Sequence, residues 1–170
     1  GVIETEAHEI VKTAKKVGAL AVVGGDPITL GVIVPPGEYG ADIVVGDIQP
    51  LGIHMYGGGG LAGFIASRDE PDIVAEYNAI LISVAPGAKT GEVGFNYSTF
   101  ERTSYDQRGD SPDYIGTTQW LWGIVAGVYL SLMGPHGMRE LGETIMQRSA
   151  YAAAQLTQLD GVRSPAFSGT

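Results

Sequence analysis

Hydrophobic residues near the start of the chain recur at three- and four-residue intervals, with charged residues between them. This spacing predicts an amphipathic helix from about Ile3 to Val17. Its acidic residues come first and its lysines last, an order that complements the helix dipole. Gly18 supplies the stop, because glycine readily adopts the left-handed conformation that ends many helices.

Short continuous apolar runs follow this helix, and such runs are typical of strands. Ala19–Val23 predicts a buried parallel strand and Ile43–Val45 a second buried strand. Leu61–Ala66 predicts a third, for which an antiparallel direction stays open. Ile80–Val84 predicts a strand from a weaker pattern, and Pro86–Gly94 predicts a loop.

The remaining segments complete a chain in which strands and helices alternate, which predicts the α/β fold class. They are a short helix at Pro71–Tyr77 that begins on Asp69 or Glu70, an exposed loop at 101–114, a helix from Thr117 or Thr118 to Leu132, and a last helix from Pro135 to Leu159. A hydroxyl side chain caps the first of the two long helices, and Gly134-Pro135 breaks the chain between them.

Composition narrows the classes of function. Of the 170 residues, 44% are hydrophobic and 17% are charged, which favours a globular chain with a real core. The net charge of −9 argues against a nucleic-acid partner, and the scattered basic residues form no membrane-surface patch. The chain has no cysteine, which excludes disulfides, a thiolate nucleophile and a cysteine zinc site. Its acidic start lacks a signal-peptide pattern, so we expect a cytoplasmic protein.

The most unusual segment joins the second predicted strand to the third. It reads Gly46-Asp47-Ile48-Gln49-Pro50-Leu51-Gly52-Ile53-His54-Met55-Tyr56-Gly57-Gly58-Gly59-Gly60. Consecutive glycines let the backbone take positive φ and come close to a ligand or a neighbouring chain. Because apolar strands lie on both sides, a tight, specialised loop is favoured over a flexible linker.

This segment and its neighbours resemble the first (alpha) subunit of the decarboxylating glycine dehydrogenase family, the pyridoxal-phosphate enzymes of the glycine cleavage system. The similarity extends through Gly24-Gly25-Asp26-Pro27-Ile28-Thr29-Leu30-Gly31, Pro35-Pro36-Gly37-Glu38-Tyr39-Gly40-Ala41-Asp42, Gly94-Phe95 and Tyr129-Leu130-Ser131-Leu132-Met133-Gly134-Pro135-His136-Gly137-Met138-Arg139-Glu140. It implies part of the large domain of the fold type I pyridoxal-phosphate transferases, with residues 1–170 as a single α/β domain. The family subunit is much longer, so this chain is expected to be a fragment, a proteolysed product or one piece of a split gene.

The resemblance also implies where a cofactor would lie. In fold type I enzymes an aspartate at this strand end pairs with the pyridinium nitrogen, which makes Asp26 the leading cofactor-binding candidate; His54 and Gly57, Gly58, Gly59 and Gly60 are expected near the same site. From the residues alone, an Asp-Pro turn or helix cap is the favoured role for Asp26.

The family's catalytic subunit carries a His-Lys pair before its glycine loop, and that lysine forms the Schiff base. Here Gln49 and Pro50 stand at those positions, and proline has no amine. Lys89 is the only lysine outside the first helix and is a poor candidate, so no catalytic residue is assigned. The resemblance thus implies a lysine-bearing second subunit that holds pyridoxal phosphate, with none bound covalently to this chain.

The function implied is a share in glycine decarboxylation, with transfer of the aminomethyl group to a lipoyl carrier protein. The alternative is a catalytically inactive homologue that acts as a structural subunit. Pro50 motivates this alternative, and so does a departure at residues 107–115, where the family's Arg-Arg-x-Lys-x-x-Ser-Asn-Ile reads Gln107-Arg108-Gly109-Asp110-Ser111-Pro112-Asp113-Tyr114-Ile115.

Two further groups of residues carry weaker signals. His8, His54 and His136 share no metal-ligand spacing, so no metal site is predicted. The aromatic helix around Trp120, Trp122 and Tyr129 is expected to pack in the core or to form a subunit interface.

Overall fold

The computed structural model describes residues 4–55, 61–74, 76–77, 81–98 and 118–163. Its contacts fall into two compact units, one made of Gly1–Ala66 with Gln119–Thr170 and the other of Ser67–Thr118. Whether these units form the single domain expected from the sequence stays a prediction. The two units are described separately below.

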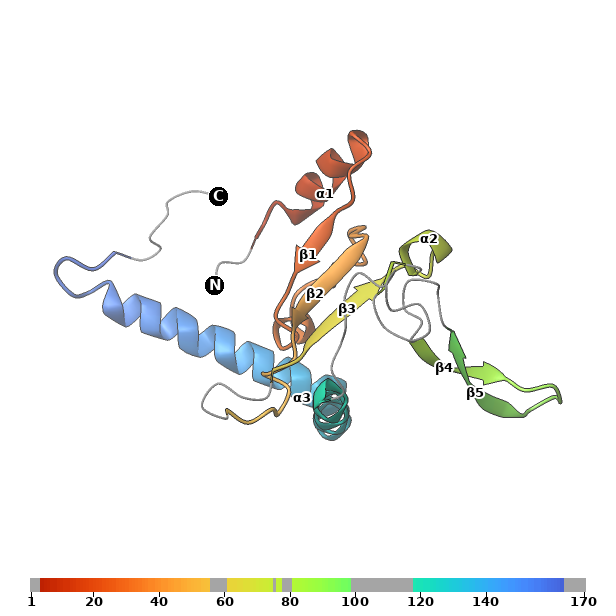
Figure 1. Cartoon of the computed structure of the whole chain (residues 1–170). Coiled ribbons are helices and arrows are strands. Elements are labelled where there is room, and N and C mark those ends of the chain that lie inside the picture. The colour runs from red at the N-terminus through yellow and green to blue at the C-terminus, as the bar shows by residue number, and fades with distance from the viewer. Residues whose placement is uncertain (1–3, 56–60, 75, 78–80, 99–117, 164–170) are drawn as a thin grey trace. The chain divides into compact units, whose positions relative to one another are not determined.

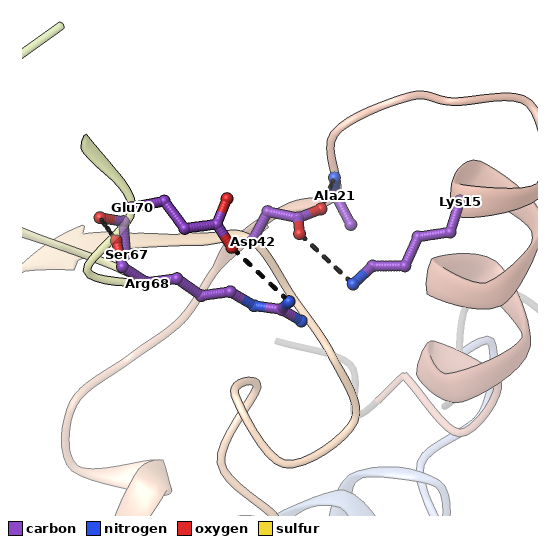
Figure 2. Close-up of polar contacts among 6 residues, drawn as sticks. All are labelled: Lys15, Ala21, Asp42, Ser67, Arg68 and Glu70. Carbon is purple, nitrogen blue, oxygen red and sulfur yellow. Dashed lines mark hydrogen bonds and ion pairs between the residues drawn. The ribbon is translucent and has the colours of Figure 1, made fainter. Parts of the chain in front are cut away.

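The first unit begins with helix α1 (Ala7–Lys16), which confirms the predicted amphipathic helix. Val11 is its buried residue, Lys15 and Lys16 lie in the last turn, and Gly18 takes a φ of +73° just beyond it. The Lys15 ammonium lies 3.3 Å from the Asp42 carboxylate, whose other oxygen accepts a hydrogen bond of 2.8 Å from the Ala21 N–H (Figure 2). Asp42 therefore joins α1 to the start of the sheet.

Three strands form the sheet in the order β1 (Val22–Gly24), β2 (Ile43–Asp47) and β3 (Gly63–Ser67) (Figure 1). β1 and β2 are parallel, as predicted, with Val22 opposite Ile43. Just past the end of β2, the Ile48 N–H donates to the Ala62 carbonyl beside the start of β3, so β3 runs antiparallel. The predicted burial of the first strand is wrong, because Val22 is 57% exposed.

The core of this unit forms where the long helix α3 (Thr118–Leu156) meets the segments that leave the parallel strands. Its buried members are Ile28, Ile48, Leu51, Ile53, Ala126 and Met138. Trp122, Tyr129 and Met133 pack against them, so core packing of the aromatic helix is confirmed for these side chains, whereas Trp120 is exposed. A Cβ added to Gly31 would lie 2.7 Å from the Met138 carbonyl oxygen, so the chain after β1 packs directly on the helix backbone.

Helix α3 is interrupted at Gly134, as the sequence predicts. Gly134 has φ +59° and ψ −178°, and Pro135 follows it. The part after the break ends at Leu156 rather than Leu159. Only its first residues pack on the core, through Met138 and Leu141, while Leu156 is exposed, so the predicted apolar face is buried over a shorter length than expected.

The second unit contains helix α2 (Pro71–Val74) and a hairpin of β4 (Leu81–Pro86) and β5 (Val93–Ser98). The short helix is confirmed, with the Ile73 and Val74 N–H groups bonded to the Glu70 carbonyl. β4 is confirmed too. The loop predicted at Pro86–Gly94 is shorter than expected. Pro86 ends β4 and Val93 begins β5, and these two residues pair in the antiparallel hairpin. The predicted loop at 101–114 lies outside the described residues.

Candidate functional site

The site predicted from the sequence lies at the edge of the sheet where β1 and β2 end. Parallel strands bring their carboxyl ends to one edge, which is where ligands bind in open α/β sheets. The register pairs Val22 with Ile43 and Gly24 with Val45, and the same offset relates Asp26 to Asp47. Asp26 lies two residues beyond the end of β1 and Asp47 is the last residue of β2, so this offset gives the two carboxylates matching positions.

Each of these carboxylates closes a turn of its own. Asp26 Oδ1 accepts a hydrogen bond of 2.9 Å from the Ile28 N–H, and its carbonyl accepts from both the N–H and the hydroxyl of Thr29. These bonds start the short 3₁₀ helix η1 (Thr29–Gly31). Asp47 Oδ1 accepts 2.7 Å from the Gln49 N–H. The turn that the residues alone favoured for Asp26 is therefore present.

The segment after Asp47 folds as a tight turn. The Leu51 N–H donates to the Ile48 carbonyl at 2.9 Å, and Leu51 is buried. Pro50 occupies an exposed corner of this turn. Gly52 follows with φ +82° and lies against the Tyr129 ring, where a Cβ would come within 3.0 Å. This anchors the segment on α3.

His54 is exposed, and its Nδ1 lies 3.4 Å from the neighbouring Met55 carbonyl oxygen. Gly57, Gly58, Gly59 and Gly60 lie outside the described residues. The structure thus places Asp26 at the carboxyl edge and His54 on the segment that leaves it.

An open hollow of about 350 Å³ lies next to this edge. Its lining is Gly46, Asp47, Leu61, Ala62, Gly63 and Gln119. Gly46 is required there, because an added Cβ would collide with the Gly25 carbonyl and the Phe64 ring. The sequence did not point to Asp47 and Gln119 as residues that line this hollow. For Asp47 a signal existed, since it follows the apolar run Ile43–Val45 as Asp26 follows Ala19–Val23.

The four lysines are divided between the two units. Within the first unit they are all on α1, and Lys15 is fixed to Asp42 where the parallel strands begin. No lysine occurs between Lys16 and Lys89. Lys89 belongs to the second unit, is highly exposed and lies 3.7 Å from Glu92. Within the first unit, therefore, no lysine lies at the carboxyl edge of β1 and β2.

Two further observations limit the chemistry of the described residues. They contain no group of three or more His, Asp or Glu side chains that could hold a metal ion. None of the described helices combines the length and apolar character that crossing a bilayer requires.

Comparison with known proteins shows the family of this chain. The family model for the glycine cleavage system P-protein matches residues 1–167. The chain belongs to the glycine cleavage system P-protein family. It is 39% identical over 165 residues to a probable glycine dehydrogenase (decarboxylating) subunit 1 of Saccharolobus islandicus, covering 97% of this chain and 36% of that protein. It is 36% identical over 169 residues to the same-named protein of Aeropyrum pernix, covering 99% and 36%.

A solved P-protein has the same fold. The crystal structure of glycine decarboxylase (P-protein) of the glycine cleavage system, in inhibitor-bound form, superposes with a TM-score of 0.81 at 34% identity. The match covers 92% of this chain and 35% of that one. The α/β fold of the pyridoxal-phosphate transferases and the resemblance to subunit 1 are thereby confirmed. The chain spans about a third of the length of the P-protein relatives it matches.

Proposed function

We propose that this chain forms part of the first subunit of a decarboxylating glycine dehydrogenase and completes an active site whose Schiff-base lysine comes from a second subunit. The relatives named glycine dehydrogenase subunit 1 support the assignment to that subunit. The carboxyl edge without an amine supports the second half of the proposal, because Pro50 stands where a lysine would be needed. The lack of a lysine at this edge of the first unit is the observation on which the proposal rests.

In the proposed assembly, glycine loses carbon dioxide and its aminomethyl group passes to a lipoyl carrier protein. Pyridoxal phosphate, held by the second subunit, supplies the electron sink for this decarboxylation. We assign this chain's Asp26, His54 and the Gly57–Gly60 loop to the surroundings of that cofactor. The prediction of a cytoplasmic location rests on the sequence alone.

What this chain contributes is a rigid border for the site. The turns closed by Asp26 and Asp47 fix the backbone at the carboxyl edge, and Leu51 and Gly52 hold the following segment against α3. Such fixed elements position a site better than free loops do. Each carboxylate uses Oδ1 in its turn, and both side chains are exposed.

The direct test is glycine-dependent exchange of labelled bicarbonate. It is measured with the chain alone, then with a lysine-bearing second subunit and lipoyl carrier. We expect exchange only in the mixture. The second subunit must first be shown active with the full-length subunit 1 of Saccharolobus islandicus. Binding of that competent subunit without any exchange would instead support the inactive structural homologue.

The role of Asp26 is tested by a matched pair of variants, Asp26→Asn and Asp47→Asn. Asparagine keeps the oxygen that closes each turn but removes the charge. We expect Asp26→Asn to lower exchange at least tenfold in the active mixture while Asp47→Asn leaves it within about twofold. Equal effects of the two variants would assign Asp26 to the turn alone.

A further inference from the structure

Helix α3 packs against two different segments of the first unit, one before and one after its break at Gly134. Before the break, the Tyr129 ring lies against Gly52, on the segment that follows β2. After the break, the Met138 backbone lies against Gly31, in the short helix η1 that follows β1. Each part of α3 therefore supports the chain that leaves one of the two parallel strands.

The contact after the break is close from both sides. A Cβ added to Gly31 would lie 2.7 Å from the Met138 carbonyl oxygen. One turn further along α3, a Cβ added to Gly142 would collide with the Val32 side chain and lie 3.2 Å from the Ile28 carbonyl oxygen. Glycine permits this approach because it has no Cβ. Helix and loop are therefore packed so closely that neither can shift without the other.

The loop held in this way is the one that Asp26 begins. The Ile28 N–H donates to Asp26 Oδ1 at 2.9 Å. The Thr29 N–H and hydroxyl donate to the Asp26 carbonyl at 3.1 and 2.7 Å. The Thr29 carbonyl in turn accepts from the Val32 and Ile33 N–H groups, both at 2.9 Å. A displacement of this loop would therefore displace the Asp26 carboxylate.

The turn closed by Asp47 depends on the other part of α3. Asp47 Oδ1 accepts the Gln49 N–H at 2.7 Å, and the buried Leu51 follows in the same turn. Gly52, with φ +82°, then lies against Tyr129, where a Cβ would come within 3.0 Å of the ring. The two aspartates match in register, yet their turns have separate supports.

We propose that residues 138–142 of α3 position the Asp26 carboxylate independently of Asp47, with Gly31 and Gly142 as the positioning residues. The effect on the Asp26 turn follows from this packing alone. The effect on catalysis rests on the proposed function, in which Asp26 borders the cofactor that the second subunit holds. The break in α3 thus lets one helix fix two carboxylates separately.

A pair of variants with a built-in rescue tests the proposal. Gly142→Ala places a methyl group against Val32, and Val32→Ala/Gly142→Ala removes the γ-carbon atoms that this methyl group would meet. Alanine is the better helix former, so a loosened Asp26 turn would not come from a weaker α3. Gly52→Ala is the matched control, because it places a methyl group against Tyr129 on the other part of the helix.

Amide hydrogen exchange of the whole chain, followed by nuclear magnetic resonance, gives the first measurement. We expect Gly142→Ala to lower the protection of the Ile28 and Thr29 amides at least about tenfold and to leave that of Leu51 within about threefold. Val32→Ala/Gly142→Ala should restore it. Gly52→Ala should show the reverse pattern. Unchanged protection of Ile28 and Thr29 in Gly142→Ala would overturn the proposal, as would equal losses at Ile28 and Leu51.

Glycine-dependent exchange of labelled bicarbonate, in the mixture with the second subunit, gives the second measurement. We expect Gly142→Ala to lower exchange at least about fivefold and Val32→Ala/Gly142→Ala to return it to within about twofold. Full exchange by Gly142→Ala, where Asp26→Asn is impaired, would overturn the positioning role. If the unchanged chain supports no exchange with a competent second subunit, the proposed function fails, and the amide protection alone decides how Asp26 is held.

Discussion

Replacing Asp42 by alanine should destabilise the first unit more than any other single change to a surface ion pair. Asp42 lies in the chain just before β2, and its side chain is only 12% exposed. One oxygen accepts the Ala21 N–H at 2.8 Å and the other lies 3.3 Å from the Lys15 ammonium (Figure 2). A single carboxylate therefore ties α1, the start of β1 and the start of β2 together.

The two contacts of Asp42 contribute differently to the free energy of unfolding. A hydrogen bond to a charged acceptor contributes about 1.5–3 kcal/mol, and its loss leaves the buried Ala21 N–H without this acceptor. The ion pair is worth at most about 1 kcal/mol, because Lys15 is 37% exposed and solvent screens it. Asp42→Ala should therefore cost about 2–3 kcal/mol. Asp42→Asn keeps an acceptor oxygen and should cost about 1 kcal/mol.

Thermal unfolding followed by circular dichroism measures these costs. For a chain of this length, about 2–3 kcal/mol corresponds to a fall in melting temperature of roughly 4–12 °C. Lys15→Met should cost no more than about 1 kcal/mol. Lys12→Met is the control, because the Lys12–Glu9 pair is exposed on both sides and should contribute nothing measurable. A loss below about 1 kcal/mol for Asp42→Ala, or equal losses for the Lys15 and Asp42 variants, would refute this ranking.

Three further changes follow from the described geometry. Gly31→Ala should cost about 1–3 kcal/mol in chemical denaturation, because its Cβ would press on the rigid Met138 backbone; an unchanged midpoint would show that α3 can move away. Gly134→Ala should cost a similar amount of about 1–3 kcal/mol, since φ +59° with ψ −178° is strained for any side chain. Burial raises the pKa of Tyr39 above its ordinary 10.0, so the folded state holds that proton more tightly and the associated stability, complete below pH 10, is lost as pH rises further. Tyr39→Phe should flatten the fall in stability above pH 10, whereas the exposed control Tyr151→Phe should not.

Features set by neighbouring residues could be predicted from the sequence. The end of α1 at Gly18 and the break at Gly134-Pro135 depend on backbone conformations that those residues favour. The strand cores were found because continuous apolar runs are local signals. β5 was missed because its glycine-interrupted sequence becomes a strand only by pairing with β4, and the burial of Val22 was overestimated because exposure depends on what covers the strand.

The candidate site was predictable only in part, because some of its residues are brought together by tertiary packing. Asp26 stood out through its place after an apolar run and before Pro27. Gln119 could not be found, because it reaches the hollow beside Asp47 from a helix more than seventy residues away in the sequence. A hollow lined by such distant residues is created by tertiary packing, which a local pattern does not encode.

The register of β1 and β2 changes how Asp26 should be understood. An aspartate that follows a strand and precedes a proline suggests either a turn or a cofactor contact, and sequence offers no way to separate them. The sheet supplies an internal comparison, because Asp47 occupies the matching position on β2 and closes the same kind of turn through the same oxygen. The turn is thus common to both aspartates, so it gives no reason to assign a cofactor role to either of them. Any function that belongs to Asp26 alone must depend on its charge and on what approaches its exposed carboxylate, which is why substitutions that keep the turn and remove the charge are the informative ones.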